Sequence, residues 1–236
     1  MIRSSIFKIF FYLGIIVICL LFLPALILPQ RVVLFGGKIM GYWSKICLYL
    51  FLSVKVEIIG KDNLIKNEKF FIACSHQSMF ETFFLQTIFN SPIFILKKEL
   101  LKIPIFGWYL NKIGSISVER NKVSRENVGF NEKIKFSAND TDRPIIIFPQ
   151  GTRVNEKNRD PFKKGIIRIY ENLNIKCQPV AINSGSVWPK SGNLNPNKKI
   201  IISIIDPIES SLDGNQFLNL VEKKIYSELD NISNLS

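Results

Sequence analysis

The chain has 236 residues, of which 47% are hydrophobic and 21% are charged, and its formal net charge is +12. This composition excludes an intrinsically disordered chain, and the length allows one α/β domain with a substantial core plus an appendage. Four scattered cysteines without a C-x-x-C pair indicate neither a disulfide framework nor a metal site. The positive charge suits nucleic acid or an anionic membrane, but no nucleic-acid-binding motif accompanies the lysines.

The first apolar segment, residues 9–28, contains no charged residue. As a helix it would span about 30 Å, the thickness of the hydrocarbon core of a bilayer. Arg3 and Lys8 precede it and Arg31 follows it. A cleaved signal peptide would need small residues in A-x-A spacing at its end, and none are present there. The segment therefore predicts a membrane anchor.

A second apolar stretch, residues 32–52, follows a turn at residues 29–31. Lys38, Gly41 and Lys45 would share one face of a helix, which favours a helix lying in the membrane interface with its lysines toward the headgroups. We therefore expect a helix–turn–helix anchor that binds anionic lipids, with a single transmembrane span as an almost equal alternative.

From residue 54 onward, strand and helix patterns alternate. Apolar or alternating runs predict strands at residues 54–59, 69–74, 92–96, 114–120, 144–148, 177–183 and 199–205. Helices are expected near residues 104–110, 124–136 and 215–229, and between the last two strands. The pattern predicts an α/β fold, a mixed sheet layered by helices, over residues 54–236, after an anchor over residues 1–53. In such sheets the strand ends and the loops after them form the site.

The segment S-H-Q-S-M-F-E at residues 75–81 holds the only histidine of the chain, His76, directly after a predicted strand. Histidine is the usual base for a hydroxyl near neutral pH, and a carboxylate such as Glu81 can hold its tautomer. A structural alternative exists, because Ser78 and Glu81 also fit a capping box at the start of a helix. A lone histidine at a strand end is more often structural than catalytic.

Two predicted strands lead to arginines. The strand at 114–120 ends at Arg120, and the strand at 144–148 is followed by Gln150-Gly151-Thr152-Arg153. Arginine offers paired donors that match phosphate oxygens. Gly151 would allow close approach of a ligand or a positive φ. Each arginine alone is more often a solvated surface group.

Taken together, these segments resemble the 1-acyl-sn-glycerol-3-phosphate acyltransferase family of the glycerolipid acyltransferases, over roughly residues 54–189. Residues 75–81 resemble the family motif N-H-x-x-x-x-D, and residues 114–120 match G-x-x-x-[ILV]-x-R. The segment K-K-x-L-x-x-I-P-x-x-G occurs at residues 97–107, and residues 148–153 resemble F-P-E-G-T-R. Residues 178–182 are similar to V-P-[VI]-A-[IL].

Two positions depart from the motifs. Glu81 replaces an aspartate, which lengthens the side chain by one methylene and keeps its charge. Gln150 replaces a glutamate, which removes a charge, keeps an acceptor and adds a donor. The headgroup of the acceptor therefore stays open.

The resemblance implies acyl transfer from acyl-CoA or acyl-carrier protein to the sn-2 hydroxyl of lysophosphatidic acid, with phosphatidic acid as product. It implies His76 as general base and Glu81 as its orienting carboxylate. The expected substrate-binding residues are Lys97, Arg120, Gln150, Gly151, Thr152 and Arg153. Among these, the arginines and Lys97 would bind the phosphate, Gln150 a glycerol oxygen, and backbone amides near Gly151 the oxyanion.

No cofactor or metal is implied, and the expected location is the cytoplasmic face of the inner (plasma) membrane. Three alternatives remain. The chain could acylate another lysolipid or an amine-linked acceptor, it could bind membranes without catalysis, or it could be a thioesterase that uses water.

Overall fold

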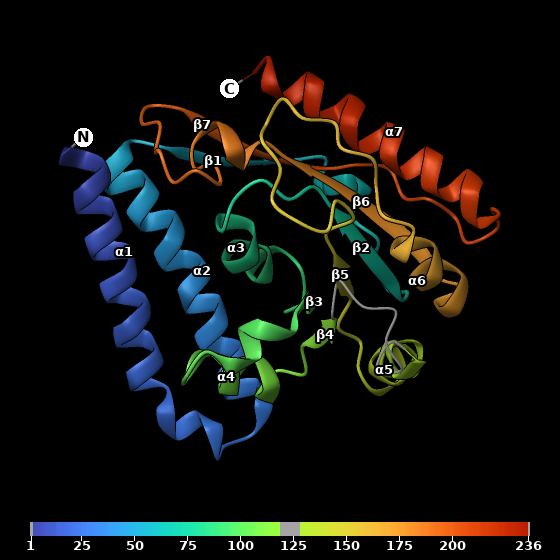
Figure 1. The fold of residues 1–236 in the computed structure, drawn as a ribbon, viewed down its shortest axis with the longest axis horizontal. Helices are drawn as coiled ribbons and strands as arrows, with labels where there is room; N and C mark the ends of the chain where they lie inside the picture. Colours follow the sequence, from blue (N-terminus) through green and yellow to red (C-terminus); the bar gives the residue numbers. More distant parts are fainter. Residues whose placement is uncertain (1, 119–127, 236) are drawn as a thin grey trace.

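The computed structural model describes residues 2–118 and 128–235, and these form a seven-stranded sheet with helices on both faces (Figure 1). The strands are β1 (Lys55–Ile59), β2 (Phe70–Cys74), β3 (Ile93–Lys97), β4 (Ile116–Val118), β5 (Ile145–Ile147), β6 (Lys176–Ile182) and β7 (Lys199–Ile204). Their order across the sheet is β1-β7-β6-β2-β5-β3-β4. Among the strands of the described residues, β6 and β7 are the one antiparallel pair. The mixed sheet is thereby confirmed, and each predicted strand overlaps an observed one.

Helices cover both faces of the sheet. They are α1 (Ile2–Leu21), α2 (Gln30–Leu52), α3 (Phe80–Ile88), α4 (Phe106–Lys112), α5 (Val128–Asp140), α6 (Gly165–Leu173) and α7 (Gly214–Ser233), with short 3-10 helices η1 (Leu23–Leu26), η2 (Lys61–Asn63), η3 (Lys98–Lys102) and η5 (Ser184–Ser186). Helix α6 was not predicted. The helix expected between the last two strands is only η5, because Pro189 and Pro196 interrupt that segment.

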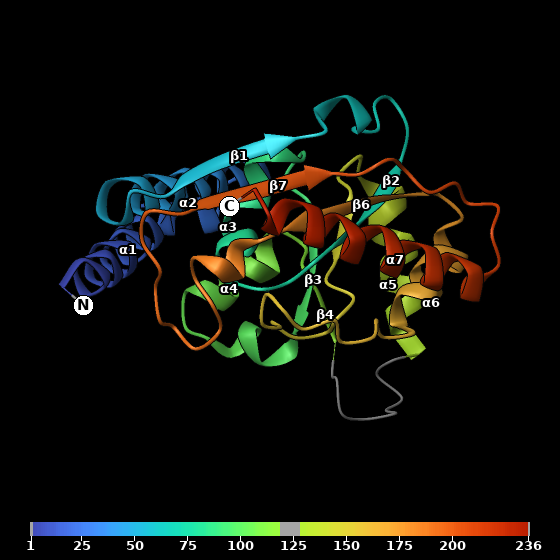
Figure 2. The same ribbon diagram turned by 90° about the horizontal axis from the view of Figure 1, so that it is seen from above.

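The sheet separates two hydrophobic cores. Alternate residues of β2 contribute to opposite sides, with Ile72 in the core under α1–α4 and Phe71 in the core under α5–α7. This alternation follows from the two-residue period of a strand. The ribbon shows α1–α4 on one side of the sheet and α5–α7 on the other, and the turned view agrees (Figures 1 and 2). Both faces of the central strands are therefore buried, which accounts for their continuous apolar sequences.

The N-terminal segment forms two neighbouring helices joined by a turn. Helix α1 ends at Leu21, earlier than the predicted 9–28, because Pro24 has no N–H to continue it and lies in η1 instead. Helix α2 begins at Gln30 directly after Pro29. Within the described residues, only α1 is long and apolar enough to cross a membrane by length and composition, with a mean hydropathy of 2.3.

Helix α2 is part of the protein core. Its buried side chains Val33, Met40, Cys47, Leu48 and Leu52 belong to the same core as α3 and the sheet. The sequence placed Gly41 on the face of this helix that was expected to point toward the headgroups, and this was wrong, because Gly41 lies against α3. A Cβ on Gly41 would approach the carbonyl oxygen of Phe83 to 2.6 Å. The face with Gly41 therefore turns toward the protein rather than toward the headgroups.

Exposed apolar side chains gather on the N-terminal helices. Of the large hydrophobic side chains that are exposed in the described chain, 17 lie within residues 2–50 and five lie elsewhere. Soluble surfaces rarely carry so much contiguous apolar area unless it binds a membrane or a protein. This distribution makes α1 and α2 the candidate membrane surface.

Candidate active site

The site lies where parallel strands end. His76 follows β2 by two residues, Lys97 ends β3, and residues 148–153 follow β5. These strands are neighbours or next neighbours in the sheet, so their carboxyl ends meet at one edge. Strand β4 ends beside β3 and leads toward Arg120. Arg120 lies outside the described residues, so its predicted role stays a prediction.

His76 and Glu81 form the central contact of the site. The Nδ1 atom of His76 lies 3.0 Å from Oε1 of Glu81. A carboxylate only accepts hydrogen bonds, so Nδ1 carries the proton and Nε2 has its lone pair free to accept one. The imidazole stacks on Phe148, with ring centroids 4.2 Å apart, and its side chain is 14% exposed. This geometry leaves Nε2 available at a partly exposed position, as a general base would require.

Glu81 is fully buried and its carboxylate meets four donors. Besides His76, the backbone N–H groups of Gln77 and Ser78 each donate to Oε1 over 2.6 Å. The hydroxyl of Ser184 donates to Oε2 over 2.8 Å. A buried charge is costly unless it is paired and hydrogen-bonded, and these donors meet that requirement. Sequence reasoning missed Ser184, which is 103 residues away along the chain.

The geometry of residues 75–81 fits both interpretations from the sequence, the capping of a helix by Ser78 and Glu81 and the orientation of His76 by Glu81. Ser78 Oγ accepts from the N–H of Phe80 over 3.1 Å, while Glu81 accepts from the N–H of Ser78. These contacts lie at the start of α3, which begins at Phe80 after Met79, and only the bond from the Ser78 N–H to Glu81 matches the predicted capping box. The same Glu81 oxygen also faces His76. One carboxylate therefore starts the helix and orients the imidazole.

The loop after β2 is joined to the loop after β6. Ser75 Oγ accepts from the N–H of Ile182 over 2.9 Å, and Gln77 Oε1 accepts from the N–H of Gly185 over 3.0 Å. A Cβ on Gly185 would lie 2.9 Å from that Gln77 oxygen, so glycine permits the close approach. These contacts fix the backbone around His76 on both sides.

Gln150 supports the backbone of His76. Its side chain is 2% exposed, and its Oε1 accepts from the N–H of His76 over 3.2 Å. It does not line the cavity described below. The expected contact of Gln150 with a glycerol oxygen stays a prediction, and the structure gives this side chain a positioning role.

Gly151 adopts a φ of +73°, in the left-handed region that favours glycine. Its N–H donates to the carbonyl oxygen of Phe148 over 2.9 Å. This N–H is therefore engaged within the turn, and the predicted oxyanion contact of backbone amides near Gly151 stays a prediction for the neighbouring amides. The turn instead directs Thr152 and Arg153 toward the cavity, which both of them line.

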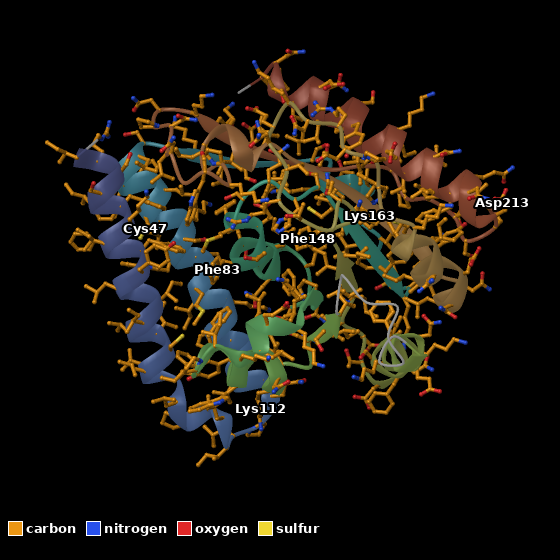
Figure 3. The ribbon with its side chains drawn as sticks, viewed as in Figure 1. Cys47, Phe83, Lys112, Phe148, Lys163 and Asp213 are labelled. Carbon is orange, nitrogen blue, oxygen red and sulfur yellow. The ribbon has the colours of Figure 1, made fainter. Side chains whose placement is uncertain are left out.

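A cavity of about 500 Å³ extends from His76 between the helices of the N-terminal side. In Figure 3, Phe83 lies on the part of α3 that faces α2, and Phe148 lies just beyond β5. The polar end of the cavity is lined by His76, Ser78, Lys97, Thr152, Arg153 and Lys190. The remainder is mostly apolar, with side chains such as Ile18, Phe22, Met40, Phe83, Phe106 and Ile113. Such a cavity suits a molecule with one polar end and a long hydrocarbon chain.

Three basic side chains of the described residues line this cavity. Lys97 pairs with Glu99, with Nζ 3.1 Å from Oε1. The pKa of Glu99 is lowered, first by a hydrogen bond with its own backbone and then by Lys97. Arg153 has no carboxylate partner within the described part of the chain. Lys190, which the sequence analysis did not single out, places its Nζ 3.4 Å from the hydroxyl of Thr152.

Comparison with known proteins gives consistent matches. A family model described as Acyltransferase matches residues 55–183, which is just over half of the chain. A 1-acyl-sn-glycerol-3-phosphate acyltransferase of Pseudomonas aeruginosa is 31% identical over 157 residues, which cover 64% of this chain and 59% of that protein. The protein of that name from Saccharomyces cerevisiae is 30% identical over 202 residues, which cover 81% of this chain and 63% of that protein. This chain thus spans about three fifths of the length of these relatives.

A solved structure shares the fold. The crystal structure of the 1-acyl-sn-glycerophosphate (LPA) acyltransferase PlsC from Thermotoga maritima superimposes with a TM-score of 0.80. The match covers 98% of this chain and 97% of that chain at 20% sequence identity. At this identity the likeness shows the fold, including the N-terminal helices.

Proposed function

The chain belongs to the acyltransferase family, and we propose that it transfers a fatty acyl group from an acyl thioester to the sn-2 hydroxyl of 1-acylglycerol 3-phosphate, forming phosphatidic acid. The observation that carries this proposal is the His76–Glu81 pair at the polar end of an otherwise apolar cavity. Both sequence relatives described above are named 1-acyl-sn-glycerol-3-phosphate acyltransferases, which supports the choice of acceptor.

His76 moves the proton in the proposed reaction. Its Nε2 takes the proton of the acceptor hydroxyl as that oxygen attacks the thioester carbon. When the tetrahedral intermediate collapses, the carbon–sulfur bond breaks and the imidazolium returns the proton to the leaving thiolate. Glu81 stabilises the imidazolium through Nδ1–H. The proposed reaction requires no metal or cofactor, because the imidazole moves the proton and the thioester supplies the leaving group.

The polar end of the cavity would hold the phosphate. Arg153 supplies a planar fork of donors that matches phosphate oxygens, and Lys97 supplies a second cation that is shared with Glu99. Arg120 remains a third candidate from the undescribed segment. The acyl donor is acyl-CoA or acyl-carrier protein, and the site chemistry accepts either because both present a thioester.

We place the enzyme at a membrane. The exposed apolar side chains of α1 and α2 would contact lipid, and the surplus of basic residues would attract anionic headgroups. Leu100 and Ile103 line the cavity and are also exposed, so the cavity opens beside this apolar surface. The four cysteines are buried thiols, which suits the reducing cytoplasmic face of the inner (plasma) membrane.

The test is an assay of purified protein with a radiolabelled acyl donor and a panel of lysolipids. Wild type should acylate lysophosphatidic acid, and His76→Ala should lose about a hundredfold to ten-thousandfold in kcat. Release of free fatty acid without any acceptor would identify a thioesterase. A His76→Ala variant that folds normally and retains activity within tenfold of wild type would exclude the general-base role.

A further inference from the structure

The loop after β6 places an additional basic side chain at the polar end of the cavity. Lys190 lines the cavity together with His76, Thr152 and Arg153. Its Nζ lies 3.4 Å from Oγ1 of Thr152, a residue that follows a different strand, β5. The ammonium group therefore lies beside the turn that carries Arg153, next to the position proposed for the acceptor phosphate.

The backbone that carries Lys190 is held in place. Trp188 is buried and packs edge-on against Phe7 and Phe11 of α1, with ring centroids 5.1 and 5.0 Å apart. The N–H of Gly192 donates to the carbonyl oxygen of Pro189 over 2.9 Å and closes the turn that contains Lys190. The position of the Lys190 backbone is thus set by the core, and only its side chain must adjust to a ligand.

The charges at this end of the cavity suggest what Lys190 recognises. Lys97 shares its charge with Glu99, whereas Arg153 and Lys190 have no carboxylate partner in the described part of the chain. A phosphomonoester carries about −1.5 to −2 charges near neutral pH. A phosphodiester carries a single negative charge. Two uncompensated cations therefore match a monoester, and one would suffice for a diester.

We propose that Lys190 is a further cation of the acceptor-phosphate subsite, beside Arg153 and the Glu99-paired Lys97, and that it makes the enzyme prefer phosphomonoester acceptors over phosphodiester acceptors. Arg153 orients the phosphate through its donor fork, and Lys190 adds a compact point charge from the opposite loop. The hydroxyl of Thr152 lies beside Lys190 and is placed to donate to the same group. This inference rests on the proposed function, because it names the selectivity of that same site.

The first experiment compares two acceptors that differ by one negative charge and one small methyl group, lysophosphatidic acid and its methyl phosphodiester, in mixed micelles with the same donor. We expect Lys190→Ala to lower kcat/KM for the monoester about tenfold, mainly through KM, and for the diester less than threefold. The KM of the donor should stay unchanged, and Lys190→Arg should retain most of the selectivity. Lys198→Ala, which removes an exposed lysine that does not line the cavity, is the control and should change neither value.

The inference would be overturned if Lys190→Ala lowered kcat/KM equally for both acceptors, or if the ratio of the two kcat/KM values stayed that of wild type. A rise in the donor KM alone would also overturn it, since Lys190 would then contact the phosphates of the donor. Failure of the proposed function is a different result, in which wild type itself does not acylate lysophosphatidic acid.

A binding measurement tests the inference in that case too. The dissociation constants of dodecyl phosphate and methyl dodecyl phosphate are measured by calorimetry in detergent. Lys190→Ala should weaken binding of the monoester about tenfold and binding of the diester much less. Equal affinities for wild type and variant would exclude Lys190 from the subsite whichever acceptor the enzyme uses.

Discussion

At the scale of single residues, Glu81 is central because one carboxylate connects three parts of the site. Its Oε1 holds the imidazole of His76 and closes the start of α3, while its Oε2 binds the hydroxyl of Ser184 from the loop after β6. Loss of any one donor should therefore affect how well the base is oriented.

Ser184 offers the cleanest test of this connection. Ser184→Ala removes one of four donors from a buried carboxylate, and we expect kcat to fall about fivefold to tenfold with little change in either KM. This is less than the full value of a hydrogen bond to a charged group, about 1.5–3 kcal/mol, because Ser184 acts on the imidazole only through Glu81. Ser186→Ala is a matched control, since Ser186 is also buried in η5 but donates to the carbonyl oxygen of Asn183. Steady-state kinetics and thermal unfolding of both variants provide the comparison.

The control variant Ser186→Ala should lose stability without losing turnover per folded molecule. If both serine variants lose stability and both keep the turnover of wild type, Ser184 is only a structural residue.

Glu81→Gln should have a stronger effect of about a hundredfold or more in kcat, because it removes the charge that stabilises the imidazolium.

At the scale of elements, the contact between α2 and α3 determines the wall of the cavity. Gly37 and Met40 of α2 line the cavity, and Gly41 lets the backbone of α3 approach closely. A Cβ on Gly41 would meet the carbonyl oxygen of Phe83 at 2.6 Å, whereas a Cβ on Gly37 would meet the end of the Gln86 side chain at 2.3 Å. Backbone cannot move away as easily as the end of a side chain. The two glycines therefore have different tolerance for substitution.

The pair of substitutions Gly41→Ala and Gly37→Ala tests this packing. We expect Gly41→Ala to lower the free energy of unfolding by about 1–3 kcal/mol, because the helices must separate. Gly37→Ala should change it by less than about 1 kcal/mol, since Gln86 can rotate and alanine favours a helix. Denaturant unfolding in detergent measures both. Equal losses for the two variants would show that the closeness of α2 and α3 at Gly41 is unimportant.

At the scale of the whole molecule, the N-terminal helices belong to the core and also carry the surface that we propose contacts lipid. The inner face of α1 and α2 joins the core around α3, while their outer face carries most of the exposed apolar side chains. Leu100 and Ile103 both line the cavity and are exposed, so we propose them as its entrance from the membrane side. A lysolipid could therefore enter the cavity from the membrane without passing through water.

Charges on the outer face of α1 should separate membrane binding from chemistry. The double variant Leu13→Glu and Leu20→Glu places carboxylates at two exposed positions, and we expect its partition onto anionic vesicles to fall at least about tenfold, because carboxylates in hydrocarbon cost several kcal/mol. Turnover of a short-chain, water-soluble acceptor should stay near that of wild type. Phe136→Glu, at an exposed apolar position on α5, is the control.

Vesicle co-sedimentation measures the partition, and the control should bind vesicles as wild type does. Unchanged partition of the double variant would mean that α1 does not contact lipid. Loss of turnover on the soluble acceptor would mean that the outer face of α1 also supports the site.

The sequence by itself determined the strands, their alternation with helices and the placement of His76 and residues 148–153 at strand ends. These depend on local apolar patterns and on the rule that parallel strands end at one edge. The N-terminal helices were also evident, although α1 ended earlier because Pro24 breaks the helix. Glu81 could be identified because it is only five residues from His76.

Only the tertiary structure decided which distant residues complete the site. Ser184 and Lys190 reach it because β6 pairs with β2 and carries its own loop beside His76, and strand order cannot be read from local patterns. The position of Gln150 under the backbone of His76, and the turn of Gly41 toward α3, likewise depend on how elements pack. Local sequence determines which elements form, but contacts between residues a hundred positions apart follow from the order of the strands and the close packing of the core.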